Sequence, residues 1–106
     1  MTDTTIKNWF LVSFDNDGTI AGQVLWGIVV EDRKSRWREN DFVCTSKVVE
    51  QFNENFFKTR NSEYECVGDG QQVILPLEAL LDLRRGFSPD EYLTMQELQK
   101  QGFTPG

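Results

Sequence analysis

The chain has 106 residues, a length that fits one compact domain with a single modest core. Asp and Glu number 17 against 11 Lys and Arg, so the formal net charge is −6, which favours a basic partner and disfavours nucleic acid, whose phosphates must be neutralised by basic side chains. Histidine is absent, which excludes Ser-His and Cys-His nucleophiles and leaves only cysteines and carboxylates for any zinc site.

The first three quarters of the chain carry the composition of β-strands. Segments rich in aromatic and β-branched residues alternate with turn-forming ones, and the first two segments read as an antiparallel hairpin. Five strands are predicted, at residues 8–14, 22–31, 42–50, 56–67 and 71–76.

From Leu77 the apolar period changes, because leucines recur at helical spacing in LEALLDLRR. This pattern predicts a helix over 77–85 that ends at Gly86.

A second helix is predicted over 89–101. Ser88 can cap its start, Pro89 suits the first helical position, and Glu91 can close a capping box.

The hairpin strands have two apolar faces, with Trp9 and Leu11 on one face and Phe10, Val12 and Phe14 on the other. Two apolar faces predict a sheet that curls or is covered by the terminal helices. The expected fold class is therefore α+β: a curved antiparallel sheet or small barrel of about five strands, followed by two C-terminal helices. We expect a single domain over 1–106, β-rich over 8–76 and helical over 77–101.

The segment FLVSFDNDGTIAG, residues 10–22, places Asp15 and Asp17 behind an apolar run, in the order that resembles haloacid-dehalogenase phosphatases. That chemistry also needs parallel strands joined by crossover helices, and residues 20–76 show no convincing pattern for one. Asp-Gly between apolar runs favours a hairpin turn, with a minimal magnesium-dependent phosphatase as the alternative. The segment also lacks the glutamate that completes a calcium loop, so we expect no metal and no cofactor.

Cys44 and Cys66 each lie in an alternating apolar segment, which favours a place in the core. A disulfide or a shared metal is the alternative.

The connection EDRKSRWREND surrounds Trp37 with basic side chains that equal its acidic ones in number. This balance favours a solvated loop with Trp37 against the sheet; binding of nucleic acid or an anionic ligand is the alternative.

The blocks GQVLWGIVVED, NDFVCTSKV, TRNSEYECVGDG and LRRGFSPDE resemble small uncharacterised proteins of bacteriophages and prophages. The resemblance implies a phage setting and brings no catalytic residues. Small acidic phage proteins often bind a host protein, and some inhibit bacterial defence systems.

The leading hypothesis is a non-enzymatic binding protein, a phage accessory or anti-defence inhibitor that occupies a basic surface on a host protein such as a CRISPR or other defence component. A toxin-neutralising immunity protein is the alternative binding class. No apolar run could cross a bilayer and the start does not resemble a secretion signal, so we expect no membrane partner and a location in the cytoplasm of the bacterial host. The candidate contacts are Asp15, Asp17, Trp37, Glu63, Glu65 and Asp69.

Overall fold

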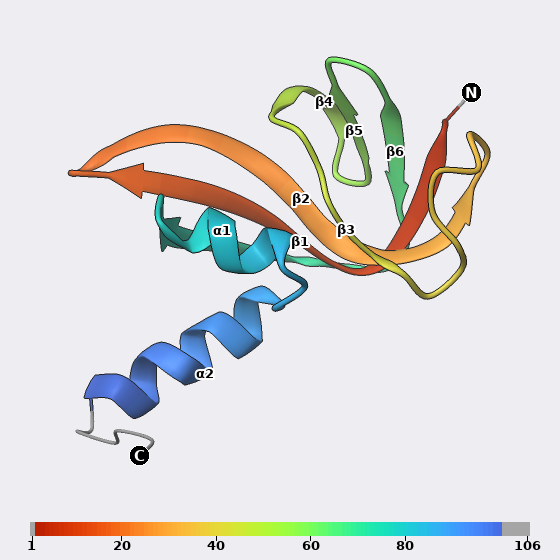
Figure 1. Ribbon diagram of the computed structural model, residues 1–106. Coiled ribbons are helices and arrows are strands. Elements are labelled where there is room, and N and C mark those ends of the chain that lie inside the picture. Colours follow the sequence, from red (N-terminus) through yellow and green to blue (C-terminus); the bar gives the residue numbers. More distant parts are fainter. Residues whose placement is uncertain (1, 101–106) are drawn as a thin grey trace.

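A computed structural model describes residues 2–100, which form a sheet of seven strands followed by two helices (Figure 1). The strands are β1 (Thr4–Asn16), β2 (Thr19–Asp32), β3 (Phe42–Cys44), β4 (Val48–Asn53), β5 (Phe56–Thr59), β6 (Glu63–Cys66) and β7 (Gln71–Pro76), and the helices are α1 (Ala79–Arg84) and α2 (Pro89–Lys100). The α+β class is confirmed, but the sheet is open rather than a closed barrel, and it has more strands than the five predicted.

The long strand β1 organises the sheet. The strand order is β3-β2-β1-β6-β5-β4, and β7 also pairs with β1. The β1–β2, β2–β3, β4–β5 and β5–β6 pairs are antiparallel, as expected, whereas β6 and β7 both run parallel to β1. The sheet is therefore mostly antiparallel, and β2 to β5 together form the long connection that a parallel return needs.

Two predicted strands are each divided in the structure. The segment 42–50 forms β3 and β4, which lie at opposite ends of the strand order, and 56–67 forms the β5–β6 hairpin. In that hairpin the Thr59 N–H donates to the Ser62 carbonyl across a polar turn. Asn and Ser there are turn residues, a signal that the apolar alternation on either side obscured. The strand predicted at 71–76 is confirmed as β7.

The Asp-Gly segment is a tight hairpin turn, as predicted. Asp17 and Gly18 have φ values of 54° and 88°, and Asn16 pairs with Thr19 across the two-residue loop. Positive φ at both central residues is the requirement of the turn type that suits the twist of a hairpin.

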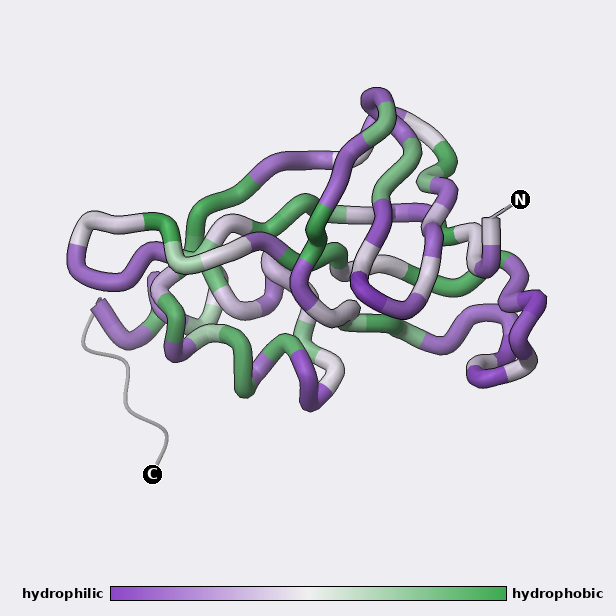
Figure 2. Tube along the Cα trace, turned by 90° about the horizontal axis from the view of Figure 1, so that it is seen from above, coloured by the Kyte–Doolittle hydropathy of each residue, from purple (hydrophilic) through white to green (hydrophobic). Residues whose placement is uncertain are grey.

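The two faces of the β1–β2 hairpin are buried in different clusters of the described residues, as the alternation predicted. The first core contains Trp9 and Leu11, and it is completed by Ile6, Leu25, Val29, Val43, Phe57, Tyr64 and Cys66. The second core contains Phe10, Val12 and Phe14, with Val24, Trp26, Leu75, Ala79, Leu83 and Tyr92. Strands β4 to β6 stand on one side of the hairpin and α1 lies on the other (Figure 1). Hydrophobic and hydrophilic stretches alternate along the chain (Figure 2).

Trp9 lies where β1 bends. Its neighbour Asn8 has a φ of 50°, and the register with β2 shifts between Lys7 and Phe10. The Trp9 indole N–H donates to the Gly68 carbonyl (3.3 Å), and a Cβ at Gly70 would overlap the indole ring. Glycine at position 70 is therefore required where the β6–β7 connection passes the ring.

Helix α1 begins two residues later than predicted, at Ala79, because the sheet extends further. The Leu77 N–H donates to the Asp15 carbonyl, which continues the pairing of β7 with β1. Helix α2 begins at Pro89 as predicted and is described to Lys100, so its predicted end at 101 lies outside the described residues.

The predicted capping box at the start of α2 is confirmed. The Glu91 N–H donates to Ser88 Oγ (3.1 Å), and the Ser88 N–H donates to Glu91 Oε1 (2.9 Å). Both bonds satisfy amide groups that have no partner within the helix.

Replacing Ser88 by Ala should lower the free energy of unfolding by about 1 kcal/mol, because the cap oxygen is lost. Ser88→Asp is the matched control, since aspartate also caps and should retain most of the stability. Denaturant melts measure both variants. Equal losses in the two would show that the cap oxygen does not stabilise α2.

Candidate functional site

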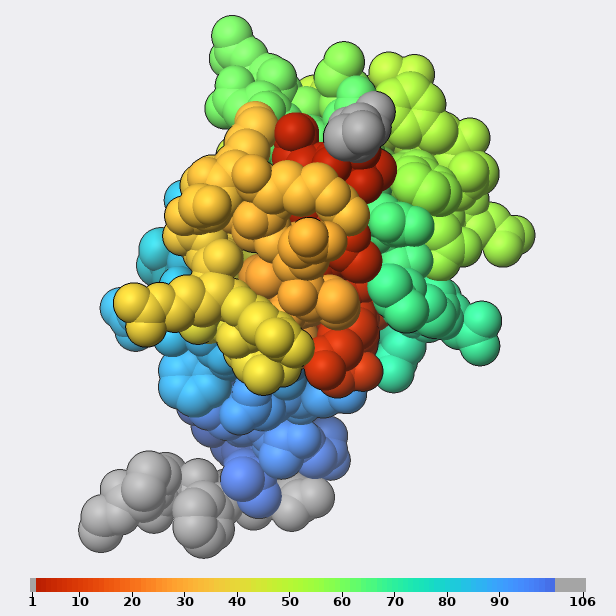
Figure 3. All heavy atoms as spheres, turned by 90° about the vertical axis from the view of Figure 1, so that its right-hand side faces the viewer, coloured from red at the N-terminus to blue at the C-terminus, as the bar shows by residue number. Residues whose placement is uncertain are grey.

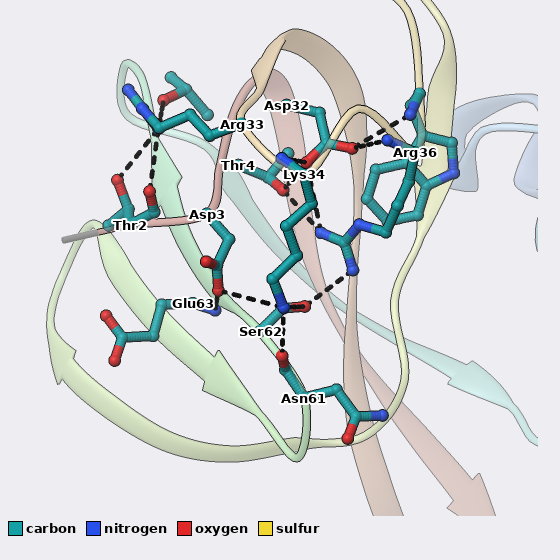
Figure 4. A network of polar contacts seen from close by, with 12 residues as sticks. Thr2, Asp3, Thr4, Asp32, Arg33, Lys34, Arg36, Asn61, Ser62 and Glu63 are labelled. Atoms are coloured by element: carbon teal, nitrogen blue, oxygen red, sulfur yellow. Dashed lines mark hydrogen bonds and ion pairs between the residues drawn. The ribbon is translucent and has the colours of Figure 1, made fainter.

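The carboxylate of Asp32, at the end of β2, is the centre of a polar network (Figure 4). Its side chain is 0% exposed. It accepts hydrogen bonds from Thr4 Oγ1 (2.9 Å) and from the backbone N–H groups of Lys34 (3.3 Å), Arg36 (2.6 Å) and Trp37 (3.1 Å). An ion pair with the Arg36 guanidinium (3.4 Å) completes its environment. Burial on its own would raise the pKa of Asp32, but the bonds from Thr4, Arg36 and Trp37 outweigh it and lower the pKa from 3.8 to about 2.

The same network holds basic side chains of the loop that follows β2. Arg36 donates to Ser62 Oγ (2.8 Å) and Thr4 Oγ1 (2.9 Å), and Lys34 Nζ donates to the Asn61 carbonyl (2.7 Å). These contacts connect the 33–41 loop to β1 and to the β5–β6 turn, which are distant in sequence but lie side by side (Figures 3 and 4).

The Arg33 side chain also makes its polar contacts within the protein. It pairs with Glu31 (3.1 Å) and donates to the Thr2 carbonyl (3.1 Å). Arg33, Lys34 and Arg36 are therefore all engaged internally, and much of the positive charge that suggested nucleic acid is neutralised locally.

Trp37 is half-buried and packs against the first core, with the Arg36 guanidinium 4.2 Å from its ring centre. The prediction that Trp37 packs on the sheet is confirmed. The loop is more than a solvated connection, because its basic side chains hold it to neighbouring strands.

The acidic candidate contacts do not form one cluster. Asp15 and Asp17 lie at the tip of the β1–β2 hairpin, whereas Glu65 pairs with Thr5 near the other end of β1. Ten residues of strand separate Thr5 from Asp15, which places these groups roughly 30 Å apart.

Glu63 and Glu65 lie together on β6, beside the start of β1. The Thr5 hydroxyl donates to Glu65 Oε1 (3.4 Å), and the Glu63 N–H donates to the Asp3 carboxylate (2.8 Å). Asp69 is exposed in the connection between β6 and β7. Among these acidic candidates, only the pair on β6 therefore lies close together.

Cys44 and Cys66 are free thiols on different sides of the hairpin, because Cys44 packs against the second core and Cys66 belongs to the first. The core prediction is confirmed for Cys66, whereas Cys44 is half-buried at the margin of the second core, and the disulfide or shared-metal alternative is wrong. Burial raises the pKa of Cys44 to about 11, although Arg84 opposes the rise, and burial with the nearby Glu65 charge raises the pKa of Cys66 to about 12. Both thiols are therefore protonated at neutral pH and are poor nucleophiles.

Asp15 and Asp17 occupy a hairpin tip rather than the end of a strand that leads into a crossover helix. Residues 20–70 form β2 to β6 and their turns. Among residues 2–100, no group of three or more His, Cys, Asp or Glu side chains could hold a metal ion. The local arrangement at Asp15 is that of a turn, with its backbone paired to β2 and β7.

Sequence reasoning missed an unpaired strand edge. Strand β7 pairs with β1 on one side, and no strand among residues 2–100 pairs with its other side. Ile74, in this strand, is 68% exposed, and Leu77 and Leu81 follow it as exposed apolar residues. The uncharged sequence QQVILP predicts a strand, but it does not indicate whether that strand lies at an edge of the sheet.

No curated protein and no solved structure matches the chain. Within residues 2–100, every helix is too short or too polar to cross a membrane. A family described as a domain of unknown function, DUF6957, matches residues 5–82, from β1 into α1. Because this match covers well over half of the chain, the chain belongs to the DUF6957 family.

Proposed function

We propose that this chain is a binding protein that acts on a basic surface of another protein and performs no chemistry of its own. The observation that carries the proposal is the internal engagement of Arg33, Lys34 and Arg36 in a chain of net charge −6. Each of these ion pairs also uses one carboxylate, so the surplus of six negative charges remains, and carboxylates dominate the charge offered to a partner.

The setting that we propose is a bacterial host cell, where the chain acts as a phage accessory or anti-defence inhibitor of a host protein. The support for this setting is the resemblance of its sequence blocks to phage and prophage proteins. A CRISPR or other defence component with a basic nucleic-acid-binding face is the kind of target that an acidic surface complements.

Charged and apolar side chains contribute differently to the proposed binding. Opposite charges accelerate the encounter between two proteins, whereas affinity comes from a few buried anchors. The exposed apolar side chains around β7 can supply such anchors, since Ile74 and Leu81 are both more than half exposed.

The test is affinity purification of the tagged chain from host lysate, followed by identification of the bound protein and reconstitution from purified components. The proposal expects a stoichiometric partner with a basic face, and no retention of duplex DNA. Retention of nucleic acid without a protein, or a reconstituted partner whose contact face is acidic, would contradict it.

Reversing charge on β6 should slow association with that partner. The double variant Glu63→Lys and Glu65→Lys should lower the association rate constant about tenfold, because these side chains contribute to electrostatic steering. The pair Asp15→Asn and Asp17→Asn is the control, and it should leave association and biological activity largely intact because these residues serve the turn. Stopped-flow mixing measures the rates, and equal rates for all three proteins would exclude steering by β6.

The enzymatic alternative has its own test. Release of phosphate from a model ester, dependent on magnesium and abolished by Asp15→Asn in a highly purified sample, would replace the binding proposal by a phosphatase.

A further inference from the structure

Strand β7 presents a regular backbone edge. It pairs with β1 from Phe10 to Asp15 without a register shift, and the edge away from β1 has no partner strand in the described part of the chain. In a strand, alternate residues direct their N–H and C=O groups to the same side, so an unpaired edge offers a row of donors and acceptors.

Other free edges of the sheet carry features that oppose strand addition, although β4 also exposes Val49 and Phe52. Strand β4 pairs with β5 with two register shifts, one before Glu50 and one after Gln51. Glu50 also places a charge on this strand. Strand β3 is only three residues long, and the Lys47 side chain lies against Gly22 beside the tip of β2. Bulges, charges and short length are the usual devices that prevent edge pairing.

Strand β7 carries neither a charge nor a bulge within residues 71–75, and Pro76 at its end is its one protective feature. Its sequence QQVIL is uncharged, its pairing is regular, and Ile74 is its most exposed apolar side chain. Val73 and Leu75 turn toward the second core, so the strand is fixed on one face while its edge stays accessible. Pro76 ends the edge because it has no N–H to donate.

Carboxylates lie at both ends of this uncharged edge. Glu54 and Asp69 line a hollow of about 220 Å³ together with Gln71 and Gln72, at the start of β7. Glu78 is exposed two residues beyond Pro76. A strand that paired with β7 would therefore meet negative charge at each end and apolar surface between them.

We propose that the β7 edge binds an extended basic segment of the partner protein, which adds to the sheet as a further strand. This inference rests on the proposed binding function and adds the chemistry of the segment: apolar or β-branched residues at its centre and Lys or Arg at its ends. Main-chain hydrogen bonds then supply affinity, and the carboxylates select charge. A second copy of this chain is a poorer occupant, because it would bring the same carboxylates to the same edge.

The probe is a synthetic peptide, KKVTVKK, labelled with a fluorophore. Its matched controls are EEVTVEE, which reverses the charge, and a KKVTVKK peptide with N-methylated central residues, which loses backbone donors. Fluorescence anisotropy measures binding to the full chain, and amide hydrogen exchange locates it. We expect KKVTVKK to bind at least about tenfold more tightly than either control, with slowed exchange at alternate amides of β7.

Ile74→Lys tests the edge on the protein side. A lysine at this exposed position should leave folding intact and lower the affinity for the KKVTVKK peptide about tenfold. An edge lysine opposes strand addition and also repels a basic ligand. Leu93→Lys adds the same charge on α2, where Leu93 is also exposed, and it should leave peptide affinity nearly unchanged.

Absence of peptide binding, equal binding of the N-methylated peptide, equal effects of the two lysine variants, or slowed exchange outside β7 would each overturn this inference. Self-association through β7, seen as a dimer by size-exclusion chromatography that Ile74→Lys dissociates, would also overturn it in favour of a second copy. If Ile74→Lys still binds the natural partner with the wild-type affinity, the proposed function stands and only the β7 assignment fails. If no basic partner exists, the proposed function fails whatever the peptide does.

Discussion

Replacing Trp26 by Ala should lower the free energy of unfolding by about 3 to 5 kcal/mol, the usual cost of truncating a large buried aromatic residue. Trp26 is 5% exposed, and its indole N–H donates to the Leu83 carbonyl (3.3 Å) at the end of α1. Its ring meets Phe10 edge-on at 6.2 Å and stacks on Phe42 at 6.1 Å. The substitution therefore leaves a cavity where β2, β3 and α1 meet.

Denaturant melts of Trp26→Ala and two companions measure this effect. Trp26→Phe keeps an aromatic ring without the donor and should cost clearly less. Ile20→Ala removes an exposed apolar side chain from the same strand and should cost little. A loss for Trp26→Ala no larger than that for Ile20→Ala would show that Trp26 does not join the helix to the sheet.

Replacing Asp32 by Ala should cost about 2 kcal/mol, because hydrogen bonds to a charged group contribute about 1.5 to 3 kcal/mol and its partner Arg36 is exposed to solvent. The substitution leaves the Thr4 hydroxyl and the N–H groups of Arg36 and Trp37 without their acceptor. Asp41→Ala is the matched control. Asp41 is an exposed aspartate of the same loop that accepts from the Arg38 N–H (2.9 Å), and its loss should cost under about 1 kcal/mol.

The stabilisation of the fold by the Asp32 carboxylate should decrease as the pH falls. Its folded-state pKa of about 2 lies below the ordinary value of 3.8, so the carboxylate stabilises the fold fully above pH 3.8 and loses this contribution as the pH falls toward about 2. The stability difference between the natural chain and Asp32→Asn, measured by denaturant melts at several pH values, should therefore shrink across that interval. A difference that stays constant across it would mean that the Asp32 pKa is not lowered by folding.

The parts of the fold that depend on local pattern could be predicted from the sequence. The Asp17-Gly18 turn, the opposite faces of Trp9 and Phe10, and the Ser88 capping box each follow from residues within a few positions of one another. Parallel pairing of β1 with β6 and β7 could not be predicted, because it depends on which distant strand returns to a free edge. The division of 42–50 between opposite ends of the sheet has the same long-range origin.

The candidate site was less predictable. The sequence shows equal numbers of acidic and basic residues around Trp37. It does not show that Asp32, Arg36 and Ser62 lie together, because Arg36 and Ser62 are 26 positions apart. The i, i+4 spacing of Asp32 and Arg36 was a local sign of pairing, but the hydroxyls of Thr4 and Ser62 become neighbours only through the sheet. The β7 edge was missed because edge position is a property of strand order.

The central claim is that acidic charge guides this chain to a basic protein partner. The most direct measurement is the association rate constant with the purified partner over a range of ionic strength from about 0.05 to 0.5 M, where screening of exposed charges increases strongly. The account predicts that the association rate falls steeply as salt is added while the dissociation rate changes little. An association rate that stays constant or rises with salt would contradict it.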